Sequence, residues 1–359
     1  MYGFEEYIKQ GEPEKKEKVY AWKTAIGLQD VDGLKPSPYL IETARQNIEG
    51  SITIGEVKLR IDDYYKAQSV RDENNRTEEA DKVSARIAEI LSEKTFTFSP
   101  AEYITIHRRL FEGIYQFAGK IRDYNITKSE WVLGGETVYY ASADSIRETL
   151  NYDFEQEKQF NYQGISLLQT VQHMTAFVSG LWQIHAFGEG NTRTTAVFMI
   201  KYLRTFGFDV KNDMFAENSQ YFRNALVRSN YNDLKNNIHA TKKYLERFFR
   251  NLLLGENNTL KNRELLVDFD KSTPQSAKNQ DNTISKSNIC TLNCTLEEHF
   301  VLEFLKTNPK ATQKEIAAHI KKSERTVKTI TSNLQQKNML ERHNGKRNGH
   351  WVVKEVSET

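Results

Sequence analysis

Apolar residues recur every three or four positions over most of the first 254 residues, which is the spacing of one helical face. Three stretches carry such a stripe, residues 36–49, 54–65 and 99–117, and the last opens with Ser99 as N-cap and Pro100 as first helical residue. Residues 165–184 are apolar on both helical faces, which predicts a central, buried helix. Further helices are expected at 191–206, 221–228 and 238–253. The polar stretch 71–81 predicts a loop or a charged helix face, and the mostly polar first 20 residues predict that order begins only near Tyr20.

Two regions depart from this helical pattern. Residues 120–142 are rich in β-branched and aromatic residues around Gly134-Gly135, which predicts a β-hairpin, and the polar residues 255–292 predict a linker. After the linker, three helical stretches and two strand-like stretches at 340–343 and 350–353 are similar to a winged helix-turn-helix domain. We therefore expect a mainly α chain. Its parts are an N-terminal helical region at 1–95, a catalytic core at 96–254, the linker, and the winged helix-turn-helix domain at 293–359.

Charge and cysteine content narrow the class of protein. The 359 residues hold 50 Lys and Arg against 48 Asp and Glu, a formal net charge of +2. From Asn293 onward the count is 12 against 8, so the basic excess lies in the tail. The only two cysteines, Cys290 and Cys294, exclude a disulfide framework and do not match the ligand sets of structural zinc sites. With no signal-peptide core and no apolar run of bilayer length, we expect a cytoplasmic protein without a membrane partner.

The segment between the apolar helices at 165–184 and 191–206 is the strongest candidate for chemistry. It contains Gly188 and Gly190 and runs directly into a helix start, where free backbone N–H groups and the positive end of the helix dipole bind phosphate. Arg193 adds charge in the first helical turn. Glu189 offers oxygen ligands suited to Mg²⁺ shared with substrate phosphates, and His185 is a candidate general base.

The order of these residues, His-x-Phe-x-Glu-Gly-Asn-x-Arg from His185 to Arg193, resembles the signature of the Fic family of nucleotidyl-transferring enzymes. The resemblance covers about residues 41–253 and implies a Fic-type helical bundle with a small β-hairpin flap at 128–140, which would align a target segment by main-chain pairing. It implies adenylylation: a Tyr, Thr or Ser hydroxyl of a target protein attacks the α-phosphate of ATP, and pyrophosphate leaves. By this resemblance His185 takes the hydroxyl proton and Glu189 holds Mg²⁺. The nucleotide phosphates meet Gly188, Gly190, Asn191, Thr192 and Arg193.

Three positions depart from the family pattern. Ala186 and Thr192 replace a proline and a glycine, and both are compatible with a loop and a helix start. Ala196 stands where the family has a second arginine that grips the γ-phosphate. That replacement leaves open a nucleotide other than ATP, with transfer of UMP, GMP or another phosphate-containing group, or a weaker enzyme.

A regulatory element is also implied by the resemblance. Many Fic proteins carry an inhibitory helix ending in Glu-Gly, which matches Glu49-Gly50 at the end of the predicted helix at about 36–50. Glu49 would then obstruct the γ-phosphate position, and Arg45, four residues earlier on the same face, is expected to pair with it. In some relatives the same glutamate helps to hydrolyse AMP from modified targets, so deAMPylation stays open as the direction of the reaction.

The tail leaves a second class of function open. Arg325, Lys328, Ser332 and Asn333 fall on or near the predicted recognition helix, and Lys346 and Arg347 fall in the wing. The tail is therefore expected to bind DNA or to serve as a protein-interaction or dimerisation module, so that DNA and a second copy of the chain join ATP and the target protein as candidate partners. The alternative to an enzyme is a DNA-binding regulator that senses nucleotide with weak or no transferase activity.

Overall fold

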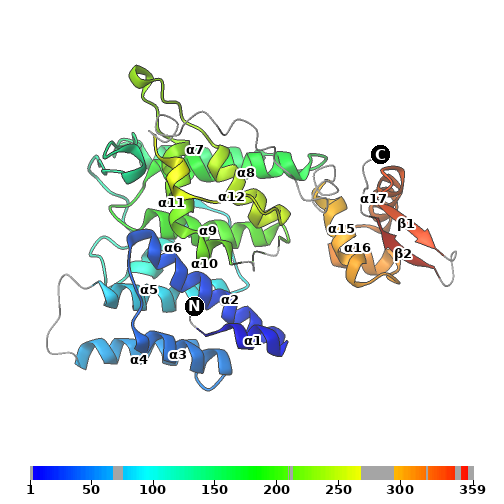
Figure 1. Ribbon diagram of the computed structural model, residues 1–359, viewed down its shortest axis with the longest axis horizontal. Helices are drawn as coiled ribbons and strands as arrows, with labels where there is room; N and C mark the ends of the chain where they lie inside the picture. The colour runs from blue at the N-terminus through cyan, green and yellow to red at the C-terminus, as the bar shows by residue number, and fades with distance from the viewer. Residues whose placement is uncertain are drawn as a thin grey trace. The chain divides into compact units, whose positions relative to one another are not determined.

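The computed structural model describes residues 3–67, 76–208, 210, 213–267, 295–320, 322–343 and 349–354. The chain divides into two compact units (Figure 1): the first contains residues 1–159, 175–248 and 259–273, and the second contains 160–174, 249–258 and 274–359. The described residues are mostly helical, as the sequence predicted, and the described strands form one two-stranded sheet. Among these residues, no helix combines the length and the apolarity that crossing a bilayer requires.

The N-terminal region of the first unit is helical from its start, so the expectation of a loosely ordered leader is wrong. Phe4 and Val19 are fully buried, and the indole of Trp22 donates to the side chain of Asn47 at 3.0 Å. Few residues of this segment are apolar, but those few are packed, which the overall polarity of the segment concealed. The elements here are α1 (Glu5–Gln10), α2 (Pro13–Gly27), η1 (Leu28–Asp32), α3 (Pro38–Glu49), α4 (Ile54–Ala67) and α5 (Thr77–Ser92).

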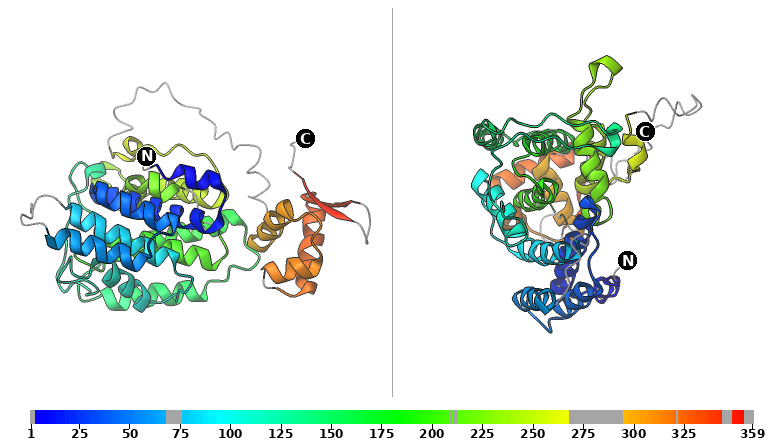
Figure 2. Two further views of the ribbon diagram at one scale, coloured as in Figure 1. Left: turned by 90° about the horizontal axis from the view of Figure 1, so that it is seen from below. Right: turned by 90° about the vertical axis from the view of Figure 1, so that its left-hand side faces the viewer.

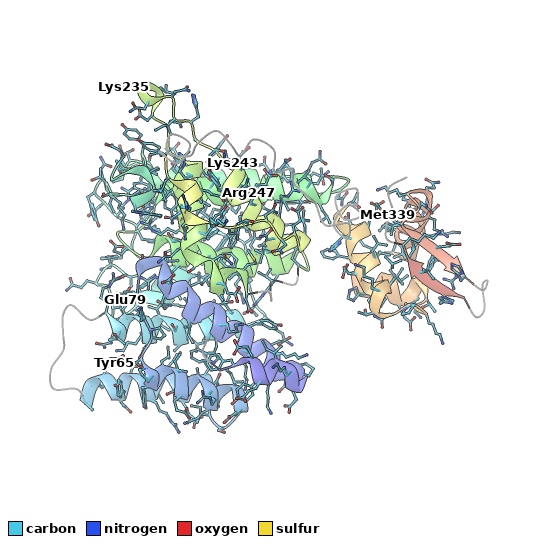
Figure 3. All side chains as sticks on the ribbon, viewed as in Figure 1. Tyr65, Glu79, Lys235, Lys243, Arg247 and Met339 are labelled. Atoms are coloured by element: carbon cyan, nitrogen blue, oxygen red, sulfur yellow. The ribbon has the colours of Figure 1, made fainter. Side chains whose placement is uncertain are left out.

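The predicted helices at 36–49 and 54–65 are confirmed as α3 and α4. Ser37 caps α3 by accepting a hydrogen bond from the Leu40 backbone N–H, and Gly50 ends it with a positive φ of 85°. The long helix α5 was not predicted. Its first residues belong to the polar stretch 71–81, yet Glu79 and Asp81 are both buried at its start. Figure 3 marks Glu79 on this helix.

The catalytic core that the sequence predicted is built around helix α9 (Asn191–Thr205), in which every residue from 191 to 203 is buried. Helix α9 packs against α5, η1 and α6 (Pro100–Phe111). Several helices of the first unit lie nearly parallel to one another when seen from below (Figure 2). The other elements between residues 97 and 267 are η2 (Trp131–Leu133), α7 (Ile146–Gln159), α8 (Leu167–Ile184), α10 (Met214–Glu217), α11 (Ser219–Ser229), η3 (Leu234–Asn236), α12 (Lys243–Leu254) and η4 (Asn262–Leu265).

Two predicted helices are shorter than expected. Helix α6 ends at Phe111 rather than near Phe117, because turns follow and Gly113 has a positive φ of 72°. Helix α12 begins only at Lys243, since Asp233 and Ile238 pair their backbones at 2.8 and 2.9 Å and close a protruding loop instead. Lys235 lies at the far end of this loop (Figure 3).

The β-hairpin predicted at 128–140 does not form as two paired strands. Two backbone bonds close the segment, from the Glu130 N–H to the Glu136 carbonyl at 2.9 Å and from the Gly135 N–H to the Glu130 carbonyl at 3.0 Å. The 3-10 helix η2 lies between them in the chain. Gly134 and Gly135 both have positive φ, as expected of a turn. The carbonyl of Val132 instead accepts from the N–H of Val267, so this backbone pairs outside the segment. We call residues 128–140 the flap segment below.

Part of the predicted linker is packed. Leu265 in η4 is fully buried, and the Tyr244 hydroxyl donates to the Glu264 carbonyl at 2.7 Å. The apolar patch that begins at Leu265, which stands out from the polar sequence around it, is thus packed in the first unit. Residues 268–292 lie outside the described residues, as do Cys290 and Cys294.

The C-terminal module has the predicted order of three helices and two strands. A capping box begins α16 (Gln313–Ile320): the Thr312 N–H donates to the Glu315 carboxylate at 2.7 Å, and the Glu315 N–H donates to the Thr312 hydroxyl at 3.3 Å. The strands pair antiparallel with Leu340 opposite Val353, and the helices enclose an apolar core that includes Trp351. That the module is a winged helix-turn-helix stays a prediction, and Lys346 and Arg347 lie outside the described residues. The elements are α15 (Leu296–Thr307), α16 (Gln313–Ile320), α17 (Glu324–Gln336), β1 (Leu340–His343) and β2 (His350–Val353).

Candidate active site

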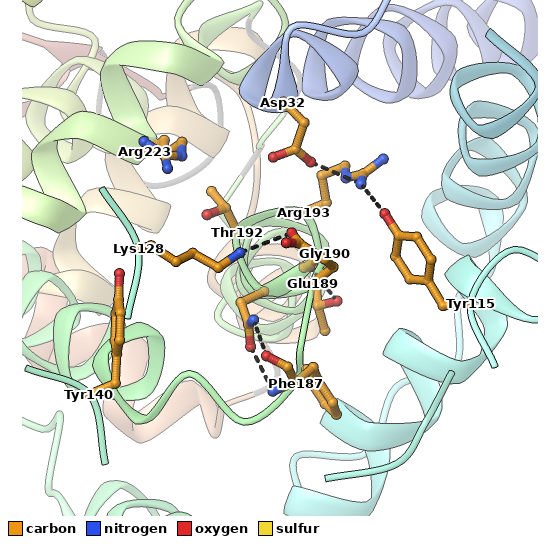
Figure 4. Close-up of polar contacts among 12 residues, drawn as sticks. Asp32, Tyr115, Lys128, Tyr140, Phe187, Glu189, Gly190, Thr192, Arg193 and Arg223 are labelled. Carbon is orange, nitrogen blue, oxygen red and sulfur yellow. Dashed lines mark hydrogen bonds and ion pairs between the residues drawn. The ribbon is translucent and has the colours of Figure 1, made fainter. Parts of the chain in front are cut away.

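The loop between α8 and α9 is pinned by its own side chains. The Asn191 amide accepts from the Phe187 N–H at 3.0 Å and donates to the Phe187 carbonyl at 2.7 Å, which closes the loop (Figure 4). Gly190 has a φ of 78°, and a Cβ at this position would overlap the ring of Phe111. The glycine is therefore required by both backbone conformation and space. Asn191 holds the loop with its side chain, so only its backbone N–H remains to meet a phosphate.

Helix α9 begins with backbone N–H groups that have no helical acceptor, the feature from which anion binding is predicted. The first helical N–H that donates inside α9 is that of Thr194, to the Gly190 carbonyl at 3.0 Å. The N–H groups of the three preceding residues therefore have no helical acceptor and lie at the positive end of the helix dipole. The Thr192 hydroxyl accepts from the Trp182 indole at 2.9 Å, so its side chain orients the helix start. Contact of residues 188–193 with a nucleotide stays a prediction.

His107 on α6 packs against the loop and hydrogen-bonds to it, and the sequence did not predict this contact. Its ring stacks on Phe187 with centroids 3.7 Å apart, and its Nδ1 accepts from the Gly119 N–H at 2.9 Å. The proton must then be on Nε2, which donates to the Glu189 carbonyl at 3.0 Å. Burial lowers the pKa of His107 to about 4. The one available signal was a histidine beside the apolar stripe of its helix, which is usual for a core residue.

His185 lies at the start of the loop with a left-handed φ of 50° and a side chain that is 3% exposed. Neither ring nitrogen has a hydrogen-bond partner among the described residues. Burial, and then the cations Lys128, Arg122 and Arg223, hold the pKa of His185 well below its usual value. The ring packs against Tyr140 of the flap segment, with centroids 4.1 Å apart. His185 is thus held as a neutral imidazole with two buried nitrogens that have no partner among the described side chains and backbone, and a neutral ring is the protonation state that a general base requires.

The backbone at His185 is held by Arg122. The guanidinium donates to the carbonyl of His185 at 2.8 Å, and also to those of Tyr124 and Ala141 at 2.6 and 2.5 Å. The several N–H donors of the Arg122 guanidinium thus hold the backbone at His185 in its left-handed conformation. The sequence offers no local signal for this contact, because it joins residues about 60 positions apart.

Glu189 is half-exposed and forms an ion pair with Lys128 of the flap segment, with Oε2 and Nζ 2.9 Å apart. Among the described residues, no three His, Cys, Asp or Glu side chains gather into a metal-binding cluster. A single carboxylate fits Mg²⁺, which keeps several waters and takes further oxygens from substrate phosphates. The donor chemistry of Glu189 therefore fits the predicted ion, although Lys128 must leave the carboxylate first.

Arg193 does not face the loop. Its side chain is fully buried, and its Nη2 lies 2.6 Å from Glu79. The same nitrogen lies 2.8 Å from Asp32 (Figure 4). Although burial alone would raise the pKa of the Glu79 carboxyl, Arg193 and Tyr115 lower it. The predicted phosphate contact of Arg193 is therefore not present in this structure, because the guanidinium is committed to carboxylates of η1 and α5.

Residue 196, where the family pattern has its second arginine, lies in the packed interior. Ala196 is fully buried on α9. Beside it, the Thr195 hydroxyl is bonded to Tyr103 at 2.9 Å.

The structure does not bring Glu49 to the loop. Helix α3 packs against α2 and α4, whereas α9 packs against α5, α6 and η1. Glu49 is exposed, and its carboxylate accepts from the Tyr7 hydroxyl at 2.5 Å. Arg45 pairs with Glu42 at 2.6 Å and not with Glu49. The predicted pairing of Arg45 with Glu49 is thus wrong in this structure, where the helix turns Glu49 toward α1. The inhibitory role of Glu49, and its role in orienting water in a reverse reaction, stay predictions.

Comparison with known proteins bears on this site. The chain is 25% identical over 175 residues to protein adenylyltransferase VbhT of Bartonella schoenbuchensis, a match covering 48% of this chain and 35% of VbhT. The chain thus spans about a third of the length of that curated relative.

Solved structures with similarity include a Fic family protein from Desulfovibrio desulfuricans G20. The match has 10% identity, covers 98% of this chain and 91% of that one, and has a TM-score of 0.43. Another is the N-terminal Fic domain of Bep8 from Bartonella sp. 1-1C, with 20% identity, coverage of 48% and 81%, and a TM-score of 0.38.

The sequence model of the Fic/DOC family matches residues 97–203, a span that contains α6, the flap segment, His185 and the whole loop. This stretch of the chain, which carries the loop near its C-terminal end, is therefore similar to the Fic/DOC family.

Proposed function

We propose that this protein is a protein adenylyltransferase that transfers AMP from ATP to a hydroxyl side chain of a target protein. The observation that carries the proposal is His185, a buried neutral imidazole with both nitrogens unpartnered, placed directly before a phosphate-binding helix start. The match of residues 97–203 to the Fic/DOC family and the similarity to VbhT support the same reaction class.

In this mechanism the triphosphate meets the free N–H groups at the start of α9, and the target hydroxyl approaches from the side of the flap segment. His185 takes the hydroxyl proton as the new O–P bond forms at the α-phosphorus and the bond to the bridging oxygen of pyrophosphate breaks. The fixed amides stabilise the charge that develops on the transferred phosphoryl oxygens. Mg²⁺ held by Glu189 would neutralise phosphate charge. His107 fixes the position of the Glu189 backbone through the hydrogen bond to its carbonyl.

The test is transfer of label from ATP carrying ³²P at either the α or the γ position, with lysate proteins and the enzyme itself as acceptors. We expect protein labelling from the α-label only, and loss of at least a hundredfold in His185→Ala. His239→Ala is the matched control, because His239 is exposed on the protruding loop. Competition by unlabelled UTP and GTP identifies the nucleotide. If neither the α-labelled nor the γ-labelled ATP labels protein while ATP binding is intact, the nucleotide-sensing regulator is favoured instead.

A second candidate function, nucleic-acid binding by the C-terminal module, is supported by the surface of α17. Its residues Arg325, Lys328, Ser332 and Asn333 are all exposed, on the face opposite the apolar core. Phosphate contacts from such a face produce binding that weakens steeply with salt. We expect Arg325→Ala with Lys328→Ala to abolish low-salt binding of a duplex in fluorescence anisotropy, and Lys306→Ala on α15 to leave it unchanged. Absence of binding at low salt by the unmodified protein would favour a protein-interaction role.

A further inference from the structure

Lys128 forms an ion pair with Glu189, the carboxylate to which the proposed Mg²⁺ would bind. Its backbone N–H donates to the Thr137 hydroxyl at 3.1 Å, which fixes its place at one end of the flap segment. From there the side chain crosses to Glu189 (Figure 4), where the ammonium and carboxylate oxygen are 2.9 Å apart. Only about a quarter of the lysine side chain is exposed, while about half of the Glu189 side chain is. The ammonium is thus held beside the loop rather than in bulk water.

The other cations at the site are committed elsewhere. Arg122 donates to four backbone carbonyls, and Arg223 forms an ion pair with buried Glu130 at 2.7 Å. Arg193 is fully buried against Glu79 and Asp32. For any of these guanidiniums to bind a phosphate, it would have to give up bonds to backbone carbonyls or to a buried carboxylate, which is costly.

Lys128 differs from these three because its partner is the one carboxylate that a divalent cation would take. A doubly charged ion on Glu189 displaces the ammonium, and the flexible four-carbon stem allows the ammonium to move while the backbone stays in place. The nearest new partner for a cation beside Glu189 is the triphosphate at the start of α9. Glu189 keeps a cationic partner throughout, because the metal ion would replace the ammonium of Lys128.

We propose that Lys128 is the phosphate-binding cation of this site, taking the part that the sequence assigned to Arg193 and that Ala196 cannot supply. This inference rests on the proposed function. Lys128 holds Glu189 until Mg²⁺ binds and then pairs with a nucleotide phosphate. The flap segment thereby becomes part of the nucleotide site as well as a wall of the target site.

The experiment compares the intact protein with Lys128→Met, which keeps most of the stem and removes the charge. Lys235→Met, on the exposed protruding loop, is the matched control (Figure 3). Binding of Mg²⁺-ATP is measured by isothermal titration calorimetry, and binding of Mn²⁺ alone by electron paramagnetic resonance. We expect Lys128→Met to weaken Mg²⁺-ATP binding at least tenfold and to tighten Mn²⁺ binding, with Lys235→Met unchanged in both.

The outcomes separate the two proposals. If the unmodified protein binds Mg²⁺-ATP and Lys128→Met binds it within threefold, the role of Lys128 is overturned and the proposed function stands. Equal Mn²⁺ affinity in the two proteins overturns the competition for Glu189. If the unmodified protein binds no nucleoside triphosphate, both proposals fail. Equal melting temperatures of the three proteins establish that a loss of binding is local.

Discussion

His107 links the geometry of the loop to pH. Its Nδ1 accepts from the Gly119 N–H, so a proton on that nitrogen would break the bond and place a charge in the core. Burial lowers the pKa of His107 from 6.5 to about 4 in the folded protein, whereas the unfolded chain keeps the usual value. Between these two values the unfolded chain binds more protons than the folded one. The free energy of unfolding must therefore fall as the pH falls.

The size of the effect follows from the shift. A shift from 6.5 to about 4 corresponds to about 3 kcal/mol at about 1.4 kcal/mol per pKa unit. Because His107 is fully buried, solvent screening does not reduce this figure. The contribution is complete above about pH 6.5, has fallen by about 2 kcal/mol at pH 5, and by about 3 kcal/mol at pH 4.

The assay is urea unfolding at several pH values between 4.5 and 7.5, in the unmodified protein and in His107→Gln. The glutamine amide keeps one donor and one acceptor but does not titrate. We expect the difference in unfolding free energy between the two proteins to shrink by about 2 kcal/mol from pH 7 to pH 5. His239→Gln, on the exposed protruding loop, serves as control and should leave the pH profile unchanged. A difference that stays constant over this range would refute the neutral, buried His107 derived from the structure.

Three further predictions follow from contacts in the first unit. Gly190→Ala should abolish ATP binding in calorimetry and lower the melting temperature, because the added Cβ meets a neighbouring ring at a positive φ; unaltered binding would contradict the loop geometry. Glu79→Ala leaves Arg193 buried with one partner fewer and should cost about 3–5 kcal/mol in urea unfolding, against less than about 0.5 kcal/mol for the exposed Glu42→Ala. Similar losses in the two would argue against the buried pair. Glu49→Gly should leave label transfer within twofold of the unmodified protein, since Glu49 is exposed on α3, and a large activation would support the inhibitory role instead.

Much of the site could be predicted from local sequence. The order of residues from His185 to Arg193, between two apolar stretches, places a glycine loop at a helix start, and that arrangement depends only on neighbours in the chain. The mainly helical fold and helix α3, which ends at Gly50, were predicted for the same reason. Periodicity and capping are properties of a few adjacent residues, so the sequence alone determines them.

The direction in which side chains point required the tertiary structure. Arg193 follows the loop in sequence, yet it turns to Glu79 and Asp32, which come from helices more than 100 residues earlier. Glu49 ends a helix with the expected Glu-Gly pattern, but the packing of α3 against α2 sets it beside Tyr7 instead. His107 and Lys128 became part of the site because folding brings α6 and the flap segment to the carbonyl and the carboxylate of Glu189. Which charges meet is decided by long-range packing, and local patterns carry no record of it.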